Sequence, residues 1–142
     1  MSKVTMSGIS SYKSEELVPA GWYPVRVNKA PNIHTSAKGK DVMFLEVTIT
    51  DVSASNEADP DLVGRVITDM FVLDISDMNP QGQDLQRKHL KNALDSFQVD
   101  TGNDSFELED FLEKEALAQV NIRMNKDLGE EQNSIKRYKK LS

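Results

Sequence analysis

Basic and aromatic side chains alternate close to the C-terminal end of the sequence, where Lys136, Arg137, Lys139 and Lys140 flank Tyr138. Lys and Arg neutralise phosphate groups, and an aromatic ring can stack on an unpaired base. This segment therefore carries the side chains that a single-stranded polyanion would need. The alternative for each residue taken singly is that the Lys or Arg is only a solvated surface charge, or that the aromatic ring packs in the core.

Residues of the same two kinds recur earlier in the chain. Further candidate phosphate contacts are Arg26, Lys38, Lys40 and Arg65, and further candidate stacking rings are Trp22, Phe44 and Phe71. They fall in or beside segments with the pattern of strands, so the fold must bring them onto one surface if they are to act together.

Residues suited to catalysis are sparse by comparison. The two histidines, His34 and His89, are far apart and belong to no metal-ligand spacing. The chain has no cysteine, no phosphate-binding glycine-rich loop and no nucleophile elbow. The acidic clusters at residues 59–61 and 107–110 lack the glycine and terminal glutamate of an EF-hand loop. We expect a protein that is not an enzyme and that uses no metal or other cofactor.

The net charge of −6 argues against nucleic acid when it is taken alone, but its distribution is uneven. Residues 1–40 carry six basic against two acidic side chains, and residues 116–142 carry six against three. Residues 41–64 carry six acidic and no basic side chains, and residues 99–115 carry seven acidic against one basic. A polarised surface of this kind can bind a polyanion on one side. Solvated acidic and basic faces are the alternative.

A length of 142 residues suffices for one domain with its own core. Residues 1–19 are rich in Ser and Lys and are expected to form a flexible N-terminal arm, with the folded domain over residues 20–142. No apolar run reaches membrane-spanning length, and the N-terminus lacks the apolar core of a signal peptide. We therefore expect a cytoplasmic protein without membrane contact.

The segment Val42–Val52 has the clearest strand pattern. Its apolar residues Met43, Leu45, Val47 and Ile49 alternate with a second set that includes Phe44. This two-residue period predicts a strand with a buried face and an aromatic ring on the opposite face. Trp22–Ala30 shows the same period and is predicted to turn Trp22 and Arg26 outward.

The segment Gly64–Leu73 also reads as a strand, but its phase is ambiguous. Unpaired charges are rarely buried, so Arg65 and Asp69 are placed on the outer face. This choice turns Phe71 outward as well, beside Phe44. The inverted phase, with Ile67 and Phe71 in the core, is the alternative.

A change of period follows the third strand. Gln83–Phe97 has apolar residues at helical spacing, and Ala116–Met124 and Gln132–Leu141 again have the pattern of strands. Three strands, a helix and two strands are the element order of the OB-fold, a partly open five-stranded barrel that binds oligonucleotides. We expect a mainly β protein with one or two helices and an OB-fold-like barrel of order β-β-β-α-β-β. The loops Pro31–Asp41 and Asn125–Glu131 would flank its binding surface.

Scattered motifs resemble a family of small phage-encoded proteins that was long catalogued as of unknown function. They are GWYPVRV at residues 21–27, TSAKGK at 35–40, GRVI at 64–67 and NSIKRY at 133–138. The resemblance covers about residues 17–141 and implies an OB-fold that binds single-stranded DNA or is related to recombination, in the host-cell cytoplasm. Many replication-type single-stranded-DNA-binding proteins end in an acidic tail, whereas this chain ends in Lys139-Lys140-Leu141-Ser142. That departure puts recruitment of partners through the tail in doubt.

We therefore expect a sequence-independent single-stranded-DNA-binding protein of phage type. It would protect or organise single strands in replication or recombination, with proteins of those processes as further partners. An exposed edge of the first or last strand could pair with a second copy. The alternatives are a β-barrel or sandwich that binds a protein in phage assembly or a host factor, and a mimic of DNA. The sequence does not separate single-stranded DNA from single-stranded RNA.

Overall fold

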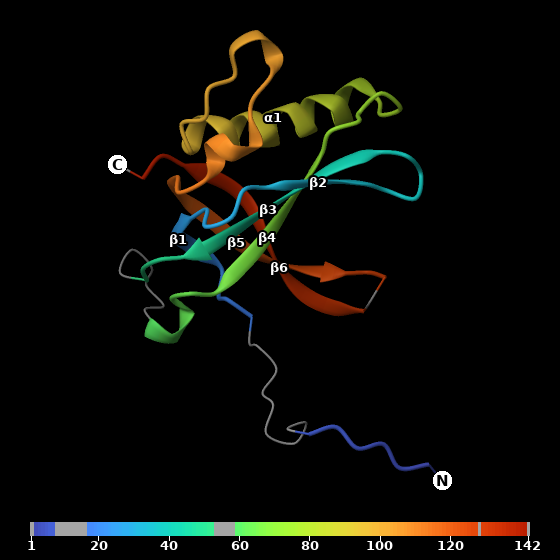
Figure 1. Cartoon of the computed structure of the whole chain (residues 1–142), viewed down its shortest axis with the longest axis vertical. Coiled ribbons are helices and arrows are strands. Elements are labelled where there is room, and N and C mark those ends of the chain that lie inside the picture. Colours follow the sequence, from blue (N-terminus) through green and yellow to red (C-terminus); the bar gives the residue numbers. More distant parts are fainter. Residues whose placement is uncertain (1, 8–16, 53–58, 128, 142) are drawn as a thin grey trace.

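The computed structural model describes residues 2–7, 17–52, 59–127 and 129–141, which form a mainly β structure with one α-helix (Figure 1). The six strands form an open antiparallel sheet. They are β1 (Gly21–Arg26), β2 (Asn32–Thr35), β3 (Asp41–Ile49), β4 (Val66–Val72), β5 (Glu115–Asn125) and β6 (Glu130–Lys139). The helix α1 spans Pro80–Ser96, and 3₁₀ turns occur at Pro60–Leu62, Gly102–Asp104 and Leu108–Phe111.

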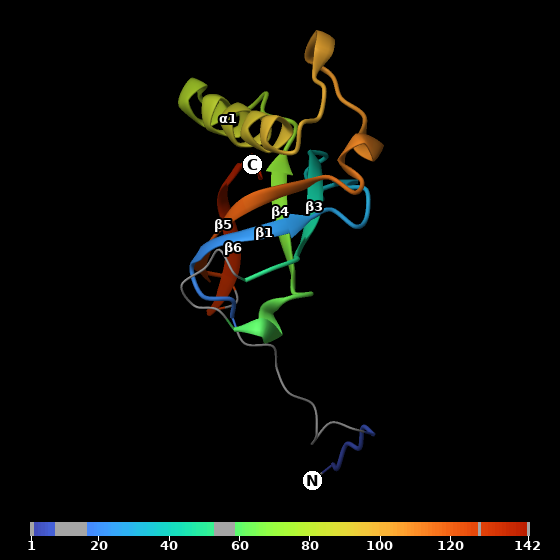
Figure 2. The same ribbon diagram turned by 90° about the vertical axis from the view of Figure 1, so that its left-hand side faces the viewer.

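Strand β3 organises the sheet because it pairs with three other strands. One of its edges pairs with β4 from Val42 to Thr48, and its other edge pairs first with β2 and then with β1. Strand β1 also pairs with β5, and β5 pairs with β6. Figure 2 shows β1 and β5 side by side, crossing in front of β3 and β4.

The buried face of β3 follows its alternating sequence. Met43, Leu45, Val47 and Ile49 are fully buried. The strand prediction for this segment is confirmed, and the core forms on the side that the apolar phase selects.

The outward assignment of Phe71 and Asp69 is wrong, because β4 has the inverted phase. Directly paired residues of an antiparallel ladder point to the same face. The buried Met43 pairs with Phe71 and the buried Leu45 pairs with Asp69, so the register turns both β4 side chains inward. Asp69 is 7% exposed, and it tolerates burial because its carboxylate is hydrogen-bonded.

The helix α1 begins where the sequence supplies a cap. The Asn79 side chain accepts a 2.7 Å hydrogen bond from the Gly82 backbone N–H, and Pro80 occupies the first turn. Ala93 and Leu94 are buried against the core, and Phe97, the C-cap residue, is buried with them. The helix lies across one end of the sheet near β4 and β6 (Figure 1).

The predicted loop Pro31–Asp41 contains an additional strand, β2, which forms a hairpin with β3. Its turn closes with a 2.7 Å bond from the Ser36 N–H to the Lys40 carbonyl, and Gly39 has a positive φ of 80°. A second hairpin joins β5 to β6 through a turn that ends at Gly129. Both hairpins project toward the right of Figure 1.

Strands β4 and β6 approach each other at the remaining seam of the sheet. In the part of the chain that the structure describes, no backbone ladder joins them, so the sheet is open here. A 2.8 Å hydrogen bond from the Tyr138 hydroxyl to Oδ2 of Asp69 crosses the seam. The predicted mainly β fold with one helix is therefore confirmed, and the described strands form an open sheet with a side-chain link across the seam.

Two expected segments lie partly outside the described residues. They are the N-terminal arm expected over residues 1–19, of which residues 1 and 8–16 are not described, and the acidic block at residues 41–64, of which residues 53–58 are not described. Near the end of the expected arm, Val18 is fully buried. None of the helices in the described ranges combines the length and the apolar character needed to cross a membrane.

Candidate functional site

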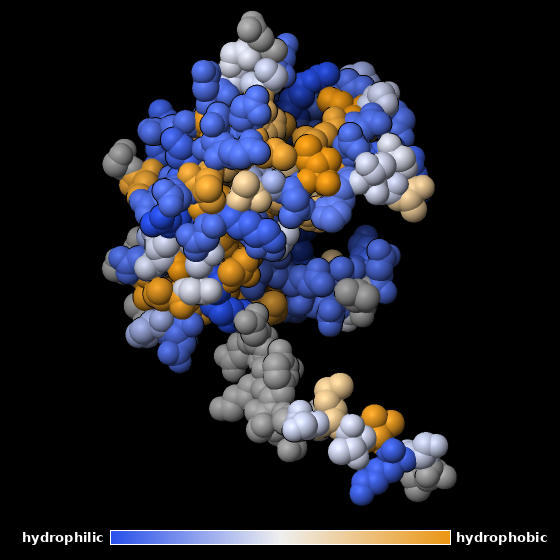
Figure 3. Space-filling view, in the orientation of Figure 1, coloured by the Kyte–Doolittle hydropathy of each residue, from blue (hydrophilic) through white to orange (hydrophobic). Residues whose placement is uncertain are grey.

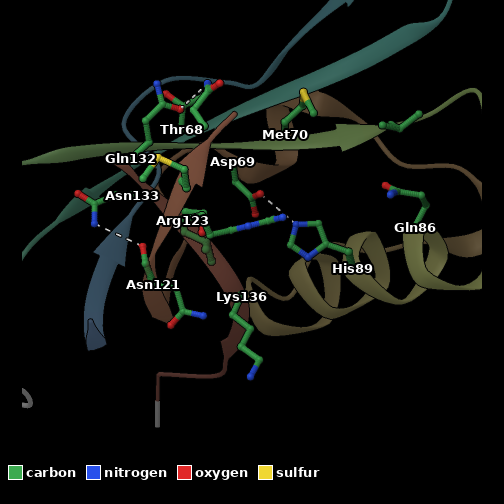
Figure 4. A pocket seen from close by; sticks show the side chains of 15 residues that line it. Thr68, Asp69, Met70, Gln86, His89, Asn121, Arg123, Gln132, Asn133 and Lys136 are labelled. Carbon is green, nitrogen blue, oxygen red and sulfur yellow. Dashed lines mark hydrogen bonds and ion pairs between the residues drawn. The ribbon is translucent and has the colours of Figure 1, made fainter. Parts of the chain in front are cut away.

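A groove of about 720 Å³ lies between β4, α1 and the β5–β6 hairpin. In Figure 3 the surface is hollowed between two protruding lobes, which correspond to the β2–β3 and β5–β6 hairpins of Figure 1. Figure 4 shows the groove from close by, with Thr68 and Met70 on β4 and with Asp69 and His89 facing each other. The groove therefore adjoins the open seam of the sheet.

The side chains that line the groove are mostly polar. Those with amide or hydroxyl groups are Thr68, Gln86, Asn121, Asn125, Gln132, Asn133 and Ser134. The apolar ones are Met70, Val72, Met124 and Ile135, and the remaining ones are Asp69, His89, Arg123 and Lys136. Amide groups both donate and accept hydrogen bonds, and the two cations can attract an anion. This combination suits a ligand with polar edges and negative charge.

The wall formed by the β5–β6 hairpin results from its register. Asn121 pairs with Ser134 and Arg123 pairs with Gln132 across the two strands, so their side chains share one face. Two-stranded ribbons twist strongly, and this twist turns the hairpin toward β4. Four polar groups are thereby presented to the groove.

A β-bulge places Lys136 in the groove. Arg137 pairs with Gln119 whereas Ile135 pairs with Val120, which leaves Lys136 as an extra residue on β6. Bulges re-aim side chains locally. Because of this bulge, Ile135 and Tyr138 both point into the core although they are three residues apart.

The floor of the groove contains a buried carboxylate with two partners. Asp69 Oδ1 lies 3.0 Å from His89 Nε2, and Asp69 Oδ2 accepts the Tyr138 hydrogen bond. The His89 ring also stacks on Phe71, with 4.5 Å between the ring centroids. These contacts hold the Asp69 carboxylate and the His89 ring in place at the floor of the groove.

Tyr138 is fixed on both sides of its backbone. Its N–H donates a 2.7 Å bond to the Asn92 side chain, and its carbonyl accepts a 3.0 Å bond from the same carboxamide. Burial, the neighbouring Asp69 charge and the hydrogen bond to Asp69 raise the pKa of the Tyr138 hydroxyl well above its ordinary value. The phenol therefore stays protonated and donates to Asp69.

The lower end of the groove is tied to the chain that leads into β1. The Asn133 side chain accepts a 2.9 Å bond from the Val18 N–H and donates a 2.8 Å bond to the Val18 carbonyl. One carboxamide thus satisfies both backbone groups of a buried residue, as a neighbouring strand would. Asn133 has a structural role in addition to its place in the groove lining.

Above the groove, the outer face of β2 and β3 carries an aromatic pair. Phe44 pairs across the sheet with Asn32 on one side and with Met70 on the other. The His34 ring meets Phe44 edge-on at a centroid distance of 5.4 Å. Phe44 is half-buried and Met70 is exposed, so together they extend the groove with a surface on which a flat ring could lie.

A second basic and aromatic surface lies on the outer face of β1, β5 and β6. The Lys139 ammonium is 4.9 Å from the centroid of the Trp22 ring, a cation–π contact. Arg137 Nε donates a 2.9 Å bond to the Gln119 side chain. At the far end of β1, Arg26 forms an ion pair with Glu113 at 3.8 Å.

Comparison with known proteins assigns the chain to a family. A family model described as "Protein of unknown function (DUF669)" matches residues 5–142. The chain belongs to this family. No curated protein matches the chain. The match of the DUF669 family spans both hairpins, the helix and every residue of the groove.

For two residues of this DUF669 chain, Phe71 and Tyr138, the prediction of an exposed stacking ring is wrong. Phe71 and Tyr138 are each 1% exposed and cannot present a face to a base. Register explains the first, since Phe71 pairs with the inward Met43. The bulge at Lys136 explains the second, because it turns Tyr138 toward the core within the basic segment.

The other expected site residues fall into separate groups. Phe44 lies beside the groove and Lys136 lines it, and Lys38 is exposed on the β2–β3 turn. Trp22, Arg26, Arg137 and Lys139 belong to the outer face of β1, β5 and β6, and Lys140 is exposed after β6. Arg65 precedes β4, and Lys40 forms an ion pair with Asp77. The structure therefore divides the one predicted surface into two.

Several residues of the groove were not anticipated from sequence. They are Met70, Gln86, Asn121, Arg123, Asn125, Gln132, Asn133 and Ser134. The usable signal was the outward phase of the two last strands, which alternates polar side chains with Ile122 and Met124. Within the described residues, no cluster of three or more His, Asp or Glu could hold a metal ion.

Proposed function

We propose that this protein binds single-stranded DNA without sequence preference, in the groove between β4 and the β5–β6 hairpin. The observation that carries the proposal is the charge of that groove in a protein whose net charge is −6. Its lining presents Arg123 and Lys136, while its carboxylate, Asp69, is bonded to His89 and Tyr138. A groove that presents two cations against one hydrogen-bonded carboxylate attracts phosphate groups locally.

We also propose that the fold is an OB-fold opened at one seam. Strands β1, β3 and β4 precede the helix, and β5 and β6 follow it. The pairs β1–β3, β3–β4, β1–β5 and β5–β6 match a five-stranded Greek-key barrel, with β2 as an insertion in the first loop. In such barrels the second and third strands and two loops bind oligonucleotides. Here the corresponding elements are β3, β4 and the two projecting hairpins, which surround the groove.

The proposed chemistry divides between phosphates and bases. Arg123 and Lys136 would contact phosphates, and Lys38 would do so from the β2–β3 turn. Phe44, with Met70 beside it, would support a base, and stacking on an aromatic ring contributes roughly 1–3 kcal/mol per base. The protein would release the strand unchanged and would act in replication or recombination of a phage.

The test is the binding of a fluorescein-labelled oligo-thymidine, measured by anisotropy over a series of salt concentrations. We expect Arg123→Ala combined with Lys136→Ala to weaken binding about tenfold at low salt. The slope of log affinity against log salt should become shallower by about 1.4, since each phosphate contact on a single strand contributes about 0.7.

The matched control removes an arginine and a lysine from α1, with Arg87→Ala combined with Lys88→Ala. Both side chains are exposed and neither lines the groove. This control should leave affinity and slope close to those of the unmodified protein. Absence of binding at low salt, or an equal loss in the control, would contradict the proposal.

A second candidate is a protein partner, favoured by exposed apolar side chains of β4 and of the β5–β6 hairpin at the groove. Met70 and Met124 are each more than half exposed and both line the groove, and Ile122 is 40% exposed nearby. Methionine-rich surfaces adapt to apolar partners. Absence of oligo-thymidine binding in the anisotropy titration would favour this candidate.

A further inference from the structure

The second basic and aromatic surface, which contains Trp22, Arg137 and Lys139, is called the Trp22 surface below. The outer face of the β5–β6 ribbon is continuous from the groove to this surface. Successive side chains of a strand alternate between its faces. Arg123 and Asn121, which line the groove, therefore share their face with Gln119 and Leu117 farther along β5. The inward phase is occupied by the buried Ala116, Ala118 and Val120.

Register extends this face across two neighbouring strands. Gln119 pairs with Trp22 on β1 and with Arg137 on β6, so the three side chains form one row. Leu117 pairs with Pro24 and with Lys139 in the next row. Neighbouring strands lie about 4.8 Å apart, so each row is roughly 10 Å wide.

The charge of this face suits the same ligand as the groove. Arg137 and Lys139 are exposed, and Lys139 lies over the half-buried Trp22 ring. The nearest acids along β1 and β5 are Glu115, which pairs with Arg26, and Glu113, which forms an ion pair with it. These two acids lie at the end of the face away from the groove, and Glu130, which pairs with Asn125, lies at the other end, beyond Arg123. The stretch between Arg123 and Lys139 therefore carries the positive charge of this face.

The bulge at Lys136 lies between the two surfaces. Lys136 lines the groove, while the next residue, Arg137, lies in the row with Trp22. Consecutive Cα atoms are about 3.8 Å apart, so two cations of one strand serve both surfaces. The bulge also increases the twist of the ribbon, which turns its two ends in different directions.

We propose that a bound single strand continues from the groove along the twisted outer face of β5 and β6 onto Trp22, Arg137 and Lys139. This inference rests on the proposed function and assigns it a longer path. The six residue-to-residue steps from Arg123 to Leu117 span about 20 Å of strand. Short oligonucleotides would occupy the groove alone, whereas longer ones would also reach Trp22.

The experiment varies oligonucleotide length. Oligo-thymidines of about 4 to 16 nucleotides cover the site sizes of single OB folds. Trp22 is the single tryptophan of the chain, so its intrinsic fluorescence reports on that surface alone. We expect the shortest oligonucleotides to bind without quenching Trp22, and the longest to bind at least tenfold more tightly and to quench it.

The unmodified protein should bind longer oligo-thymidines more tightly than short ones. A variant with Arg137→Gln and Lys139→Gln should lose most of this increase in affinity. Its affinities are measured by anisotropy, since removal of Lys139 alters the surroundings of Trp22. Thermal melting checks that it is folded, and the Arg87→Ala, Lys88→Ala protein controls for loss of two charges.

The outcomes separate the two proposals. If long oligonucleotides bind through Arg123 and Lys136, but Trp22 is not quenched and the Arg137, Lys139 variant keeps the gain with length, the extended path is refuted and the groove stands. If short oligonucleotides already quench Trp22 and do not need Arg123 or Lys136, the groove is refuted as the first site and so is the path. If no length binds at low salt, both proposals fail.

Discussion

The phenol of Tyr138 and the carboxylate of Asp69 form a 2.8 Å hydrogen bond between two strands that no backbone ladder joins in the described residues. Asp69 belongs to β4 and Tyr138 to β6, and both are buried. The bond therefore connects the two edges of the open sheet directly beneath the groove. His89 completes the arrangement by binding the other oxygen of Asp69.

Removal of this link should destabilise the protein more than loss of an ordinary tyrosine bond. Tyr138→Phe leaves Oδ2 of a buried carboxylate without its donor, and hydrogen bonds to charged groups contribute about 1.5–3 kcal/mol. Tyr23→Phe is the matched control, since the Tyr23 hydroxyl donates a 2.7 Å bond to the neutral Pro19 carbonyl. It should cost about 0.5–1.5 kcal/mol. Urea unfolding measures both, and equal losses would refute the role of Asp69.

Alkaline pH should destabilise the protein through the same tyrosine. Its pKa is raised in the folded state by burial first, then by the Asp69 charge and the hydrogen bond. In the unfolded chain Tyr138 releases its proton near the ordinary value of about 10, while the folded protein retains it. The contribution of Tyr138 to the free energy of unfolding is therefore fully present below about pH 10 and is lost as the pH rises above that value.

The measurement is the free energy of unfolding between about pH 8 and 11. A single proton changes it by at most about 1.4 kcal/mol per pH unit. The Tyr138→Phe protein lacks this group and should show the smaller decline, because lysines and the other tyrosines titrate in both. Parallel curves for the two proteins would contradict the prediction.

Loss of the ring at Phe44 should weaken binding of oligo-thymidine while the fold persists. Phe44→Leu keeps an apolar side chain for the half-buried part of this position but removes the stacking face. We expect a loss of about 1–3 kcal/mol of binding free energy, or roughly 5- to 150-fold in affinity. Ile33→Ala is the control, because Ile33 is also an exposed β2–β3 side chain but pairs with Met43 instead of Phe44. Similar affinities for the two variants would exclude Phe44 from the site.

The two lysines of the β2–β3 turn should differ in their contribution to binding. Lys40 forms an ion pair with Asp77, and the hydrogen bond from Lys40 lowers the pKa of that carboxyl. Lys38 is exposed on the same turn. We therefore expect Lys38→Ala to weaken binding at low salt more than Lys40→Ala does.

Asp77→Asn provides the reciprocal test. It releases Lys40 and should strengthen binding and steepen its dependence on salt, because one more cation becomes available to phosphates. Anisotropy titrations of the three variants at several salt concentrations measure these effects. A decrease in affinity on Asp77→Asn would show that the position of the hairpin matters more than the charge of Lys40.

Local patterns in the sequence predicted much of the fold. The alternation from Met43 to Ile49 predicted which face of β3 is buried, and the helical spacing around Ala93 and Leu94 predicted the buried side of α1. The order of strands and helix followed from these periods except for β2, which lies in the predicted loop Pro31–Asp41. Such features depend on neighbouring residues in the chain, since a side chain at i+2 or i+4 shares a face with the residue at i.

The phase of β4 and the make-up of the groove depended on partners far away in the chain. Sequence alone placed Asp69 outward, because a charge without known partners belongs in water; the partners are His89 and Tyr138, 20 and 69 residues away. The bulge that separates Lys136 from Arg137 likewise exists only in the pairing of β5 with β6. The sequence by itself therefore determined the strands, the helix and the supply of basic, amide and aromatic side chains. Only the tertiary structure decided which of them face the groove, because register and hydrogen bonding between distant segments select the exposed face of each strand.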